Sequence, residues 1–330
     1  MNLINSDFQN IPWNDITSFG QKTMLDNPLF SVSWILGRFC NYNCSYCWPY
    51  ARSDKVDHYD LEIYKKTIDE IKRQARSNGF TDFHFSFSGG EPTAYKDFLN
   101  LIDYYANDIN PKYQSFHMTS NCSPGMKWWT KTIETLAKFN RVSITASFHA
   151  EHANEIEFGD KLLLLIENGV HITINQVMVP ELFYDYYDRC SRFHNRGINV
   201  TLKPQSDPTA SFVVSGYTPE MIDIMQTGFP QNSNGEPIYQ IELKDNKNNI
   251  YLFDQAERFN AYSFNKFKGW MCNSGYQSVI IRGNEVKRSY SCHDGPLGTL
   301  DGGFTLFNHP EICITNSCVS SADSKIPKCK

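Results

Sequence analysis

The sequence contains no long run of apolar residues. A membrane-spanning helix needs about 18 or more in a row, and the 330 residues hold no such stretch. Residues 1–30 also lack the charged start, apolar run and small-residue cleavage site of a secretion signal. We therefore expect a cytoplasmic protein that has no membrane partner.

An excess of basic residues is missing as well. The chain has 31 Lys and Arg against 36 Asp and Glu, which gives a formal net charge of -5. Proteins that bind nucleic acid use a basic surface to neutralise phosphates. The composition therefore gives no reason to expect a nucleic-acid partner.

Cysteine, in contrast, is plentiful, with ten residues. Because a secretion signal is absent and the chain is far larger than a disulfide-stapled domain, metal ligation explains them better than disulfides. Two lone residues, Cys122 and Cys190, are expected to be small buried hydrophobic side chains. The others form two groups, which indicates two iron or zinc sites: Cys40, Cys44 and Cys47, and then Cys272, Cys292, Cys313, Cys318 and Cys329.

Segments rich in β-branched and aromatic residues alternate with longer segments of helical period, which is typical of βαβ units on a parallel sheet. Strands are predicted over 31–36, 82–88, 115–119, 142–147, 171–177 and 199–203, and helices over 60–78, 98–106, 127–139, 160–168 and 182–195. Polar residues at the carboxyl ends of parallel strands are typical of (β/α) barrels. We predict an α/β fold, a partial (β/α)6 TIM-like barrel with a small cysteine-rich C-terminal β-hairpin extension.

Four segments are expected along the chain: an N-terminal segment 1–30, the barrel core 31–210, a connecting segment 211–265 and a cysteine-rich domain 266–330. The pattern weakens after residue 205, with turns or hairpins expected at 231–235 and 244–249. Further on, the Gly283-Asn284 pair separates two short β segments, 279–281 and 285–287, and predicts a hairpin.

The first cysteine group has the spacing C-x3-C-x2-C, in a loop directly after the first predicted strand. Thiolates are soft ligands that suit iron-sulfur clusters or zinc. A structural zinc site normally adds a second Cys or His pair about 12 to 20 residues away, and the segment that follows offers only His58. Three cysteines instead leave one metal position open to a small ligand. A zinc knuckle is the alternative.

This segment resembles the signature of the radical S-adenosylmethionine (SAM) superfamily, C-x3-C-x-aromatic-C, with Tyr46 at the aromatic position. The resemblance implies a 4Fe-4S cluster on Cys40, Cys44 and Cys47. It also implies reductive cleavage of SAM to methionine and a 5′-deoxyadenosyl radical, which abstracts hydrogen from a substrate. An external low-potential electron donor such as flavodoxin or ferredoxin would then be a partner.

A SAM pocket is expected at the same edge of the sheet. The Gly-Gly-Glu-Pro turn after the second predicted strand allows close approach of a ligand to the backbone. After the next strand, a Ser-Asn step resembles the family's Thr-Asn-Gly, with Cys122 in place of Gly. The expected cofactor-binding residues are Tyr46, Gly89, Gly90, Glu91, Ser120, Asn121, Ser147 and Asn175.

Later strands carry further polar side chains that are placed to reach the barrel mouth, namely His149, Gln176 and Lys203. Strand alternation allows only one of Asn175 and Gln176 to face inward. For each of these residues, a hydrogen-bonded structural role is the alternative to a ligand role.

The second cysteine group flanks the predicted hairpin and resembles the SPASM and twitch extensions of radical SAM enzymes. SPASM domains use seven cysteines for two clusters, whereas only five are present here. One auxiliary 4Fe-4S cluster of the twitch type is therefore expected, and a structural zinc site is the alternative. The expected ligands are Cys272, Cys292, Cys313 and Cys318, with Cys329 as spare or substitute.

Three functions fit these features. The first is a radical SAM enzyme that abstracts hydrogen from a small polar substrate, with oxidation or rearrangement assisted by the auxiliary cluster. The second is a radical SAM maturase that modifies a ribosomal peptide. The third is a non-enzymatic iron-sulfur electron carrier or zinc-binding protein, which would not bind SAM.

Overall fold

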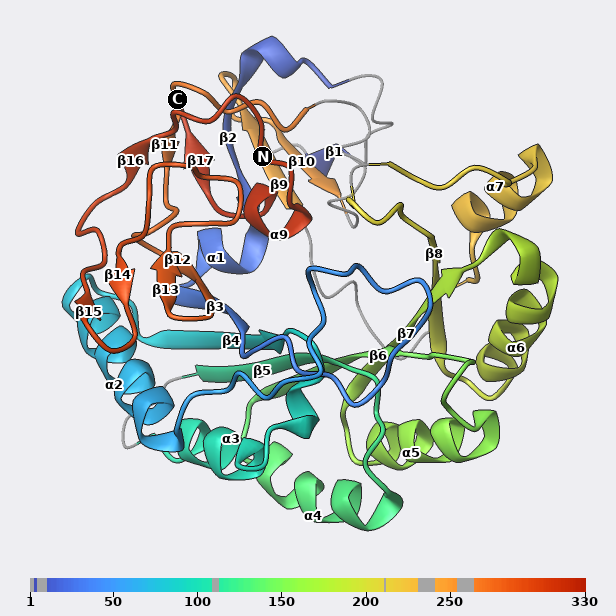
Figure 1. The fold of residues 1–330 in the computed structure, drawn as a ribbon. Helices are drawn as coiled ribbons and strands as arrows, with labels where there is room; N and C mark the ends of the chain where they lie inside the picture. The colour runs from blue at the N-terminus through green and yellow to red at the C-terminus, as the bar shows by residue number, and fades with distance from the viewer. Residues whose placement is uncertain (1–2, 5–10, 109–112, 211, 231–240, 254–263) are drawn as a thin grey trace.

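The computed structural model describes residues 3–4, 11–108, 113–210, 212–230, 241–253 and 264–330 (Figure 1). The turn expected at 231–235 lies outside these residues. The turn expected at 244–249 is present, since β9 (Ile241–Asp245) and β10 (Ile250–Phe253) pair antiparallel on either side of it. No helix of the described residues is both long and apolar enough to span a bilayer.

The larger of two sheets has ten strands in the order β15-β14-β13-β12-β3-β4-β5-β6-β7-β8. From β12 to β8 all neighbours are parallel, which confirms the predicted α/β partial barrel. The barrel strands are β3 (Leu29–Ile35), β4 (Asp82–Ser88), β5 (Tyr113–Ser120), β6 (Arg141–Ser147), β7 (His171–Met178) and β8 (Asn199–Pro204).

Five helices alternate with these strands and lie along the outer face of the sheet in Figure 1. They are α2 (Leu61–Ser77), α3 (Phe98–Ala106), α4 (Met126–Leu136), α5 (Glu155–Glu167) and α6 (Phe183–Asn195). Short 3-10 turns occur at Trp13–Asp15, Pro92–Ala94 and Pro180–Leu182. A further helix, α7 (Pro219–Thr227), follows the barrel.

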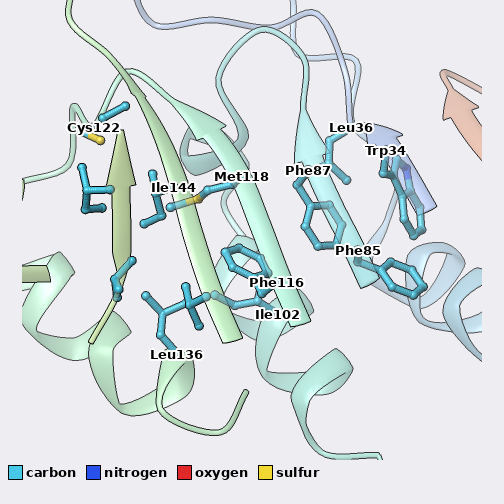
Figure 2. Close-up of a cluster of buried hydrophobic side chains, with 14 of the residues drawn as sticks. Trp34, Leu36, Phe85, Phe87, Ile102, Phe116, Met118, Cys122, Leu136 and Ile144 are labelled. Atoms are coloured by element: carbon cyan, nitrogen blue, oxygen red, sulfur yellow. The ribbon is translucent and has the colours of Figure 1, made fainter. Parts of the chain in front are cut away.

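The strand sequences place apolar side chains on the helix-facing side. In β4, Phe83, Phe85 and Phe87 are fully buried, because alternate residues of a strand point to the same face. Figure 2 shows Phe85 and Phe87 on the same side as the other buried side chains of this core. Burial of each ring contributes roughly 1.5 to 3 kcal/mol to stability.

The opposite, inner face of these strands is polar. His117 of β5 bridges two neighbouring strands, with Nδ1 at 2.7 Å from Ser86 Oγ and Nε2 at 3.0 Å from Thr145 Oγ1. One row lower, His84 Nδ1 lies 2.8 Å from Ser115 Oγ. Side-chain hydrogen bonds therefore link β4, β5 and β6 across this inner face.

A second sheet of seven strands joins the two ends of the chain. The short helices α1 (Lys22–Asp26) and α9 (Ser321–Ser324) adjoin its strands in the sequence. Its central contact pairs β2 antiparallel with both β9 and β17. The strands, in sheet order, are β1 (Leu3–Ile4), β10 (Ile250–Phe253), β9 (Ile241–Asp245), β2 (Ile16–Gln21), β17 (Lys328–Cys329), β11 (Met271–Cys272) and β16 (Glu311–Ile312).

The predicted C-terminal hairpin is present as β12 (Ser278–Arg282) and β13 (Glu285–Lys287). β12 also pairs in parallel with β3, from Ser278 opposite Ser31 to Arg282 opposite Ile35. Two short strands, β14 (Gly298–Thr299) and β15 (Gly303–Phe304), complete this edge. The hairpin thus extends the barrel sheet.

Candidate active site

The three N-terminal cysteines lie on a loop that begins at the carboxyl end of β3. Cys40 and Cys44 are partly buried and Cys47 is exposed. The loop is closed by backbone hydrogen bonds from Cys47 N to Cys44 O (3.1 Å) and from Cys40 N to Ser53 O (3.3 Å). Burial raises the pKa of all three thiols, and that of Cys44 to about 12. At neutral pH they become thiolate ligands only when a metal displaces the protons.

Asp57 fixes the start of this loop. Its carboxylate accepts hydrogen bonds from the backbone N–H of Arg38 (2.9 Å) and of Phe39 (3.0 Å). The sequence alone does not single out Asp57, because no spacing rule links a lone carboxylate to a loop 18 residues earlier. Its role is visible only once the chain is folded.

The Gly-Gly-Glu-Pro turn packs directly on the cysteine loop. Gly90 N donates to Gly37 O (2.9 Å) and Glu91 N donates to Phe39 O (2.9 Å). A Cβ atom on Gly89 would overlap Gly37 O, and one on Gly90 would overlap Phe39 O. The paired glycines therefore permit a close approach of two backbones, and this approach fixes the position of Cys40.

Glu91 links this turn to the end of β5. Its buried carboxylate accepts hydrogen bonds from Thr93 N (3.0 Å) and Oγ1 (2.6 Å), from Ser120 Oγ (2.8 Å) and from Asn121 N (2.6 Å). Burial raises the pKa of Glu91, and the hydrogen bonds act in the opposite direction. Both carboxylate oxygens are committed to protein donors, so the Glu91 side chain acts here as a scaffold.

Asn121 reaches back to the cysteine loop. Its Nδ2 donates to Asn41 Oδ1 (3.0 Å) and lies 4.0 Å from Cys40 Sγ. The next residue, Cys122, is buried and has a φ of +52°. A left-handed backbone favours glycine, which explains why the motif that this step resembles has glycine at this position.

On the opposite side, the segment after β6 holds the loop. The hydroxyl of Tyr46 lies 2.9 Å from His149 Nδ1, and burial lowers the pKa of His149 to about 4, so the ring is neutral at pH 7. Glu151 accepts hydrogen bonds from both Ser45 N (2.8 Å) and Ser45 Oγ. For Glu151, as for Asp57, no sequence pattern indicates a role in holding the cysteine loop.

Cys44, Glu151 and His152 lie close together, with one potential ligand atom of each within 4.8 Å of the others. Glu151 is already bonded to Ser45, and His152 stacks on the Tyr42 ring at 4.7 Å. Of the three loop cysteines, this group includes only Cys44.

The remaining predicted cofactor residues lie deeper along the strands. Ser147 of β6 stands opposite Asn175 of β7, and both are partly buried on the inner face. Within the described ranges, neither side chain has a hydrogen-bond partner. Gln176 points to the helix side and is fully buried, so Asn175 is the one of the pair that faces inward.

Four of the C-terminal cysteines gather in one place. Cys272, Cys313 and Cys318 are buried in one cluster, and a hydrogen bond from Val319 N to Ser291 Oγ (3.1 Å) joins the segments that carry Cys318 and Cys292. Burial raises the pKa of Cys313 and raises that of Cys318 to about 12. We call these four residues the C-terminal cysteine group.

Cys329 stands apart from this group. In the β11–β17 pair, Cys272 is opposite Lys328, whereas Cys329 is opposite Met271. Because successive residues of a strand point to opposite faces, Cys329 points away from Cys272. Cys329 is also exposed, whereas Cys272 is buried.

Comparison with known proteins adds to this geometry. The radical SAM superfamily model matches residues 34–203, just over half of the chain. An S-adenosylmethionine-dependent nucleotide dehydratase of Selenomonas ruminantium is 32% identical over 75 residues, which are 23% of this chain and 25% of that protein. Mycofactocin maturase MftC of Mycolicibacterium smegmatis is 33% identical over 94 residues, 28% of this chain and 22% of that protein. The matches thus span about a quarter of each curated relative.

Solved structures share the fold. Native anSMEcpe with bound AdoMet superposes with a TM-score of 0.52 at 16% identity, covering 83% of this chain and 78% of that one. The same protein with AdoMet and the Kp18Cys peptide gives a TM-score of 0.51 at 13% identity, with the same coverage. The family match, the parallel sheet and the cysteine loop agree. The chain belongs to the radical SAM superfamily of enzymes.

Proposed function

We propose that this protein reductively cleaves SAM at a 4Fe-4S cluster held by Cys40, Cys44 and Cys47. A 4Fe-4S cluster held there would supply the electron for cleavage of SAM to methionine and a 5′-deoxyadenosyl radical, which would abstract hydrogen from the substrate. The electron comes from an external low-potential donor such as flavodoxin or ferredoxin, available in the cytoplasm, where we place the protein.

One observation carries this proposal. The ends of β3, β4 and β5 are locked together, because the Gly-Gly-Glu-Pro turn bonds to the cysteine loop and Glu91 bonds to Ser120 and Asn121. The soft thiol donors therefore lie beside a glycine turn at the carboxyl edge of the sheet. An electron carrier needs cysteines alone, whereas here a Gly-Gly-Glu-Pro turn and the end of β5 also hold the cysteine loop at the edge of the sheet.

The residues around the expected SAM position have three roles. Gly89, Gly90, Glu91, Ser120 and Asn121 hold the pocket edge in place, and their backbone groups border the expected SAM position. Tyr46, fixed by His149, closes the other side. Ser147 and Asn175 have polar atoms on the inner face without a partner among the described residues, and they are proposed to bind SAM.

The C-terminal cysteine group is proposed to hold one auxiliary 4Fe-4S cluster, with Cys329 outside it. A buried cation favours a negatively charged cluster there, because Lys328 is opposite Cys272 in the β11–β17 pair. Arg288 is also buried, but it pairs with Asp294 at 2.6 Å. For the domain organisation, we propose the four predicted segments 1–30, 31–210, 211–265 and 266–330.

The proposed substrate is a small polar molecule, oxidised or rearranged with help from the auxiliary cluster. The partial match to a nucleotide dehydratase supports a small substrate. Peptide modification is the second candidate, and the shared fold with a protein solved with a bound peptide favours it.

Anaerobic purification, reconstitution with iron and sulfide, and reduction with dithionite would test the proposal. We expect 5′-deoxyadenosine in the presence of SAM, detected by mass spectrometry. Cys44→Ala should abolish it, whereas Cys190→Ala, a buried cysteine of α6 outside both groups, should retain it. Zinc in place of iron, or full product formation by Cys44→Ala, would contradict the cluster assignment.

Deuterated substrates would separate the two candidate functions. Transfer of deuterium into 5′-deoxyadenosine from a deuterated nucleotide or sugar would support the small substrate. Transfer only from a deuterated peptide would support the maturase function.

A further inference from the structure

A basic cavity of about 390 Å³ lies beside the C-terminal hairpin. Its lining includes the cationic or titratable side chains of Arg282, Lys287 and His293, together with Tyr290 and Cys292. Cys292 belongs to the C-terminal cysteine group, so the cavity borders the proposed auxiliary cluster. None of these basic residues is among those proposed to bind SAM.

The strand register directs both strand-borne cations toward the barrel interior. Arg282 is opposite Ile35 in the parallel β12–β3 pair, and Ile35 lies on the inner face of β3. Lys287 is opposite Ile280, which is two residues before Arg282 and so shares its face. Both therefore lie on the concave side of the sheet, at the carboxyl edge where the cysteine loop begins.

The carboxylate nearest these cations in the strand register is Glu285, which is opposite Arg282 in the β12–β13 pair. Among the described residues Arg282 has no carboxylate partner, and its guanidinium lies over the Tyr290 ring, 5.8 Å from the centroid. Lys287 pairs with Glu285 at 2.7 Å, but both side chains are about a third or more exposed, and such pairs are weak. The donors of Arg282 in particular stay available, and a guanidinium suits phosphate or carboxylate oxygens.

The cavity also lies near the loop of the first cysteine group, because Arg282 is opposite Ile35, the last residue of β3. Burial, Tyr290 and Asp207 raise the pKa of Tyr50 and Arg282 lowers it, which agrees with this register. Trp48 and Tyr50 stack with ring centroids 5.9 Å apart, and both are partly exposed. Aromatic rings and cations thus border the space between the two cysteine groups.

We propose that this cavity binds an anionic group, a phosphate or a carboxylate, of the substrate. Arg282 supplies the main donors, Lys287 adds positive charge, and the rim aromatics cover the rest of the molecule. That this anion belongs to the substrate rests on the proposed function. The reason is that an anion held here lies between the cysteine loop and the C-terminal cysteine group. Binding of the anion does not itself require SAM cleavage.

Calorimetric titration of the anaerobically reconstituted protein at low salt tests this site, with inorganic phosphate in one arm and acetate in the other. We expect the wild type to bind at least one anion, and the tighter one identifies the chemical class. The double variant Arg282→Gln, Lys287→Gln should bind about tenfold or more weakly, since charge-assisted hydrogen bonds are lost. Circular dichroism and iron content would check that it is folded.

The matched control removes two exposed cations elsewhere, Lys66→Gln and Lys131→Gln, and should bind like the wild type. Equal weakening by both variants, or no binding of either anion to the wild type, would overturn the proposal. If anions bind while wild-type protein yields no 5′-deoxyadenosine, the proposed reaction fails and the anion site stands. If that product forms but no anion binds, the reaction stands and this site fails.

Discussion

Gly90 lies where the backbone of one loop touches that of another. A methyl group at this position would overlap the carbonyl oxygens of Arg38 and Phe39, just before Cys40. We expect Gly90→Ala to displace the cysteine loop, to lower the iron content and to reduce SAM cleavage. The reduction should be about 100-fold, because misplacement by about 1 Å costs that much in other enzymes.

Iron analysis and product formation would measure the effect of Gly90→Ala. Gly125→Ala is the matched control, because a methyl group there meets no atom within 4 Å. Normal iron content and activity in Gly90→Ala would show that the close backbone contact does not position the loop.

Cys122 allows backbone strain to be separated from side-chain loss. Both Cys122→Gly and Cys122→Ala remove the buried thiol, but only alanine keeps a Cβ at a φ of +52°. The glycine variant should therefore be more stable by about 1 to 2 kcal/mol. Urea unfolding of the two variants measures the difference. An alanine variant as stable as the glycine variant would show that no strain is stored there.

For individual residues, the sequence predicted which ones lie close together but not which contacts each one makes. The spacing of Cys40, Cys44 and Cys47 and the Gly-Gly-Glu-Pro turn predicted two loops at one edge of the sheet, and these loops are in contact. The sequence did not predict that the Glu91 carboxylate bonds to protein donors, and the contact of Glu91 with SAM stays a prediction. Such contacts depend on the relative positions of strand ends, which no local pattern encodes.

The polar inner faces of β4 and β5 predict a pH-dependent stability. Burial is the main reason that the pKa of His84 falls to about 4 and that of His117 to about 3, below the ordinary value near 6.5. The folded state therefore favours the neutral rings. Their contribution is complete above about pH 6.5 and is lost as the pH falls toward the folded-state pKa values.

Urea unfolding between about pH 7 and pH 5 should show a falling free energy, by up to about 1.4 kcal/mol per pH unit for each histidine. The double variant His84→Gln, His117→Gln should show a shallower fall. Equal slopes in the wild type and the variant would mean that these rings do not cause the dependence.

Strands and helices with a clear period were predicted well. The alternation of Phe with His and Ser gave 82–88 as a strand, and β4 spans Asp82–Ser88. Helix α5 begins at Glu155, five residues before the predicted start, because Asn154 caps it by accepting a hydrogen bond from Glu157 N. The seven-stranded sheet was not anticipated, since two-residue strands such as β17 carry no periodicity.

For the molecule as a whole, the two cysteine groups predict the metal content. Fully reconstituted wild type should hold about eight iron atoms, as two 4Fe-4S clusters do. Cys313→Ala should lose about half of them, whereas Cys329→Ala should keep all, because Cys329 points away from Cys272. About four iron atoms and one zinc in the wild type would instead identify the C-terminal group as a structural zinc site.

The parallel pairing of β12 with β3 limits how this chain can be divided. Removing residues 266–330 would strip the hydrogen-bonding partner from one side of β3, and open strand edges promote aggregation. A chain shortened in this way should be insoluble rather than a free-standing catalyst. An ancestral protein that replaced this C-terminal segment with another one therefore had to gain, in the same event, a new strand that pairs with β3.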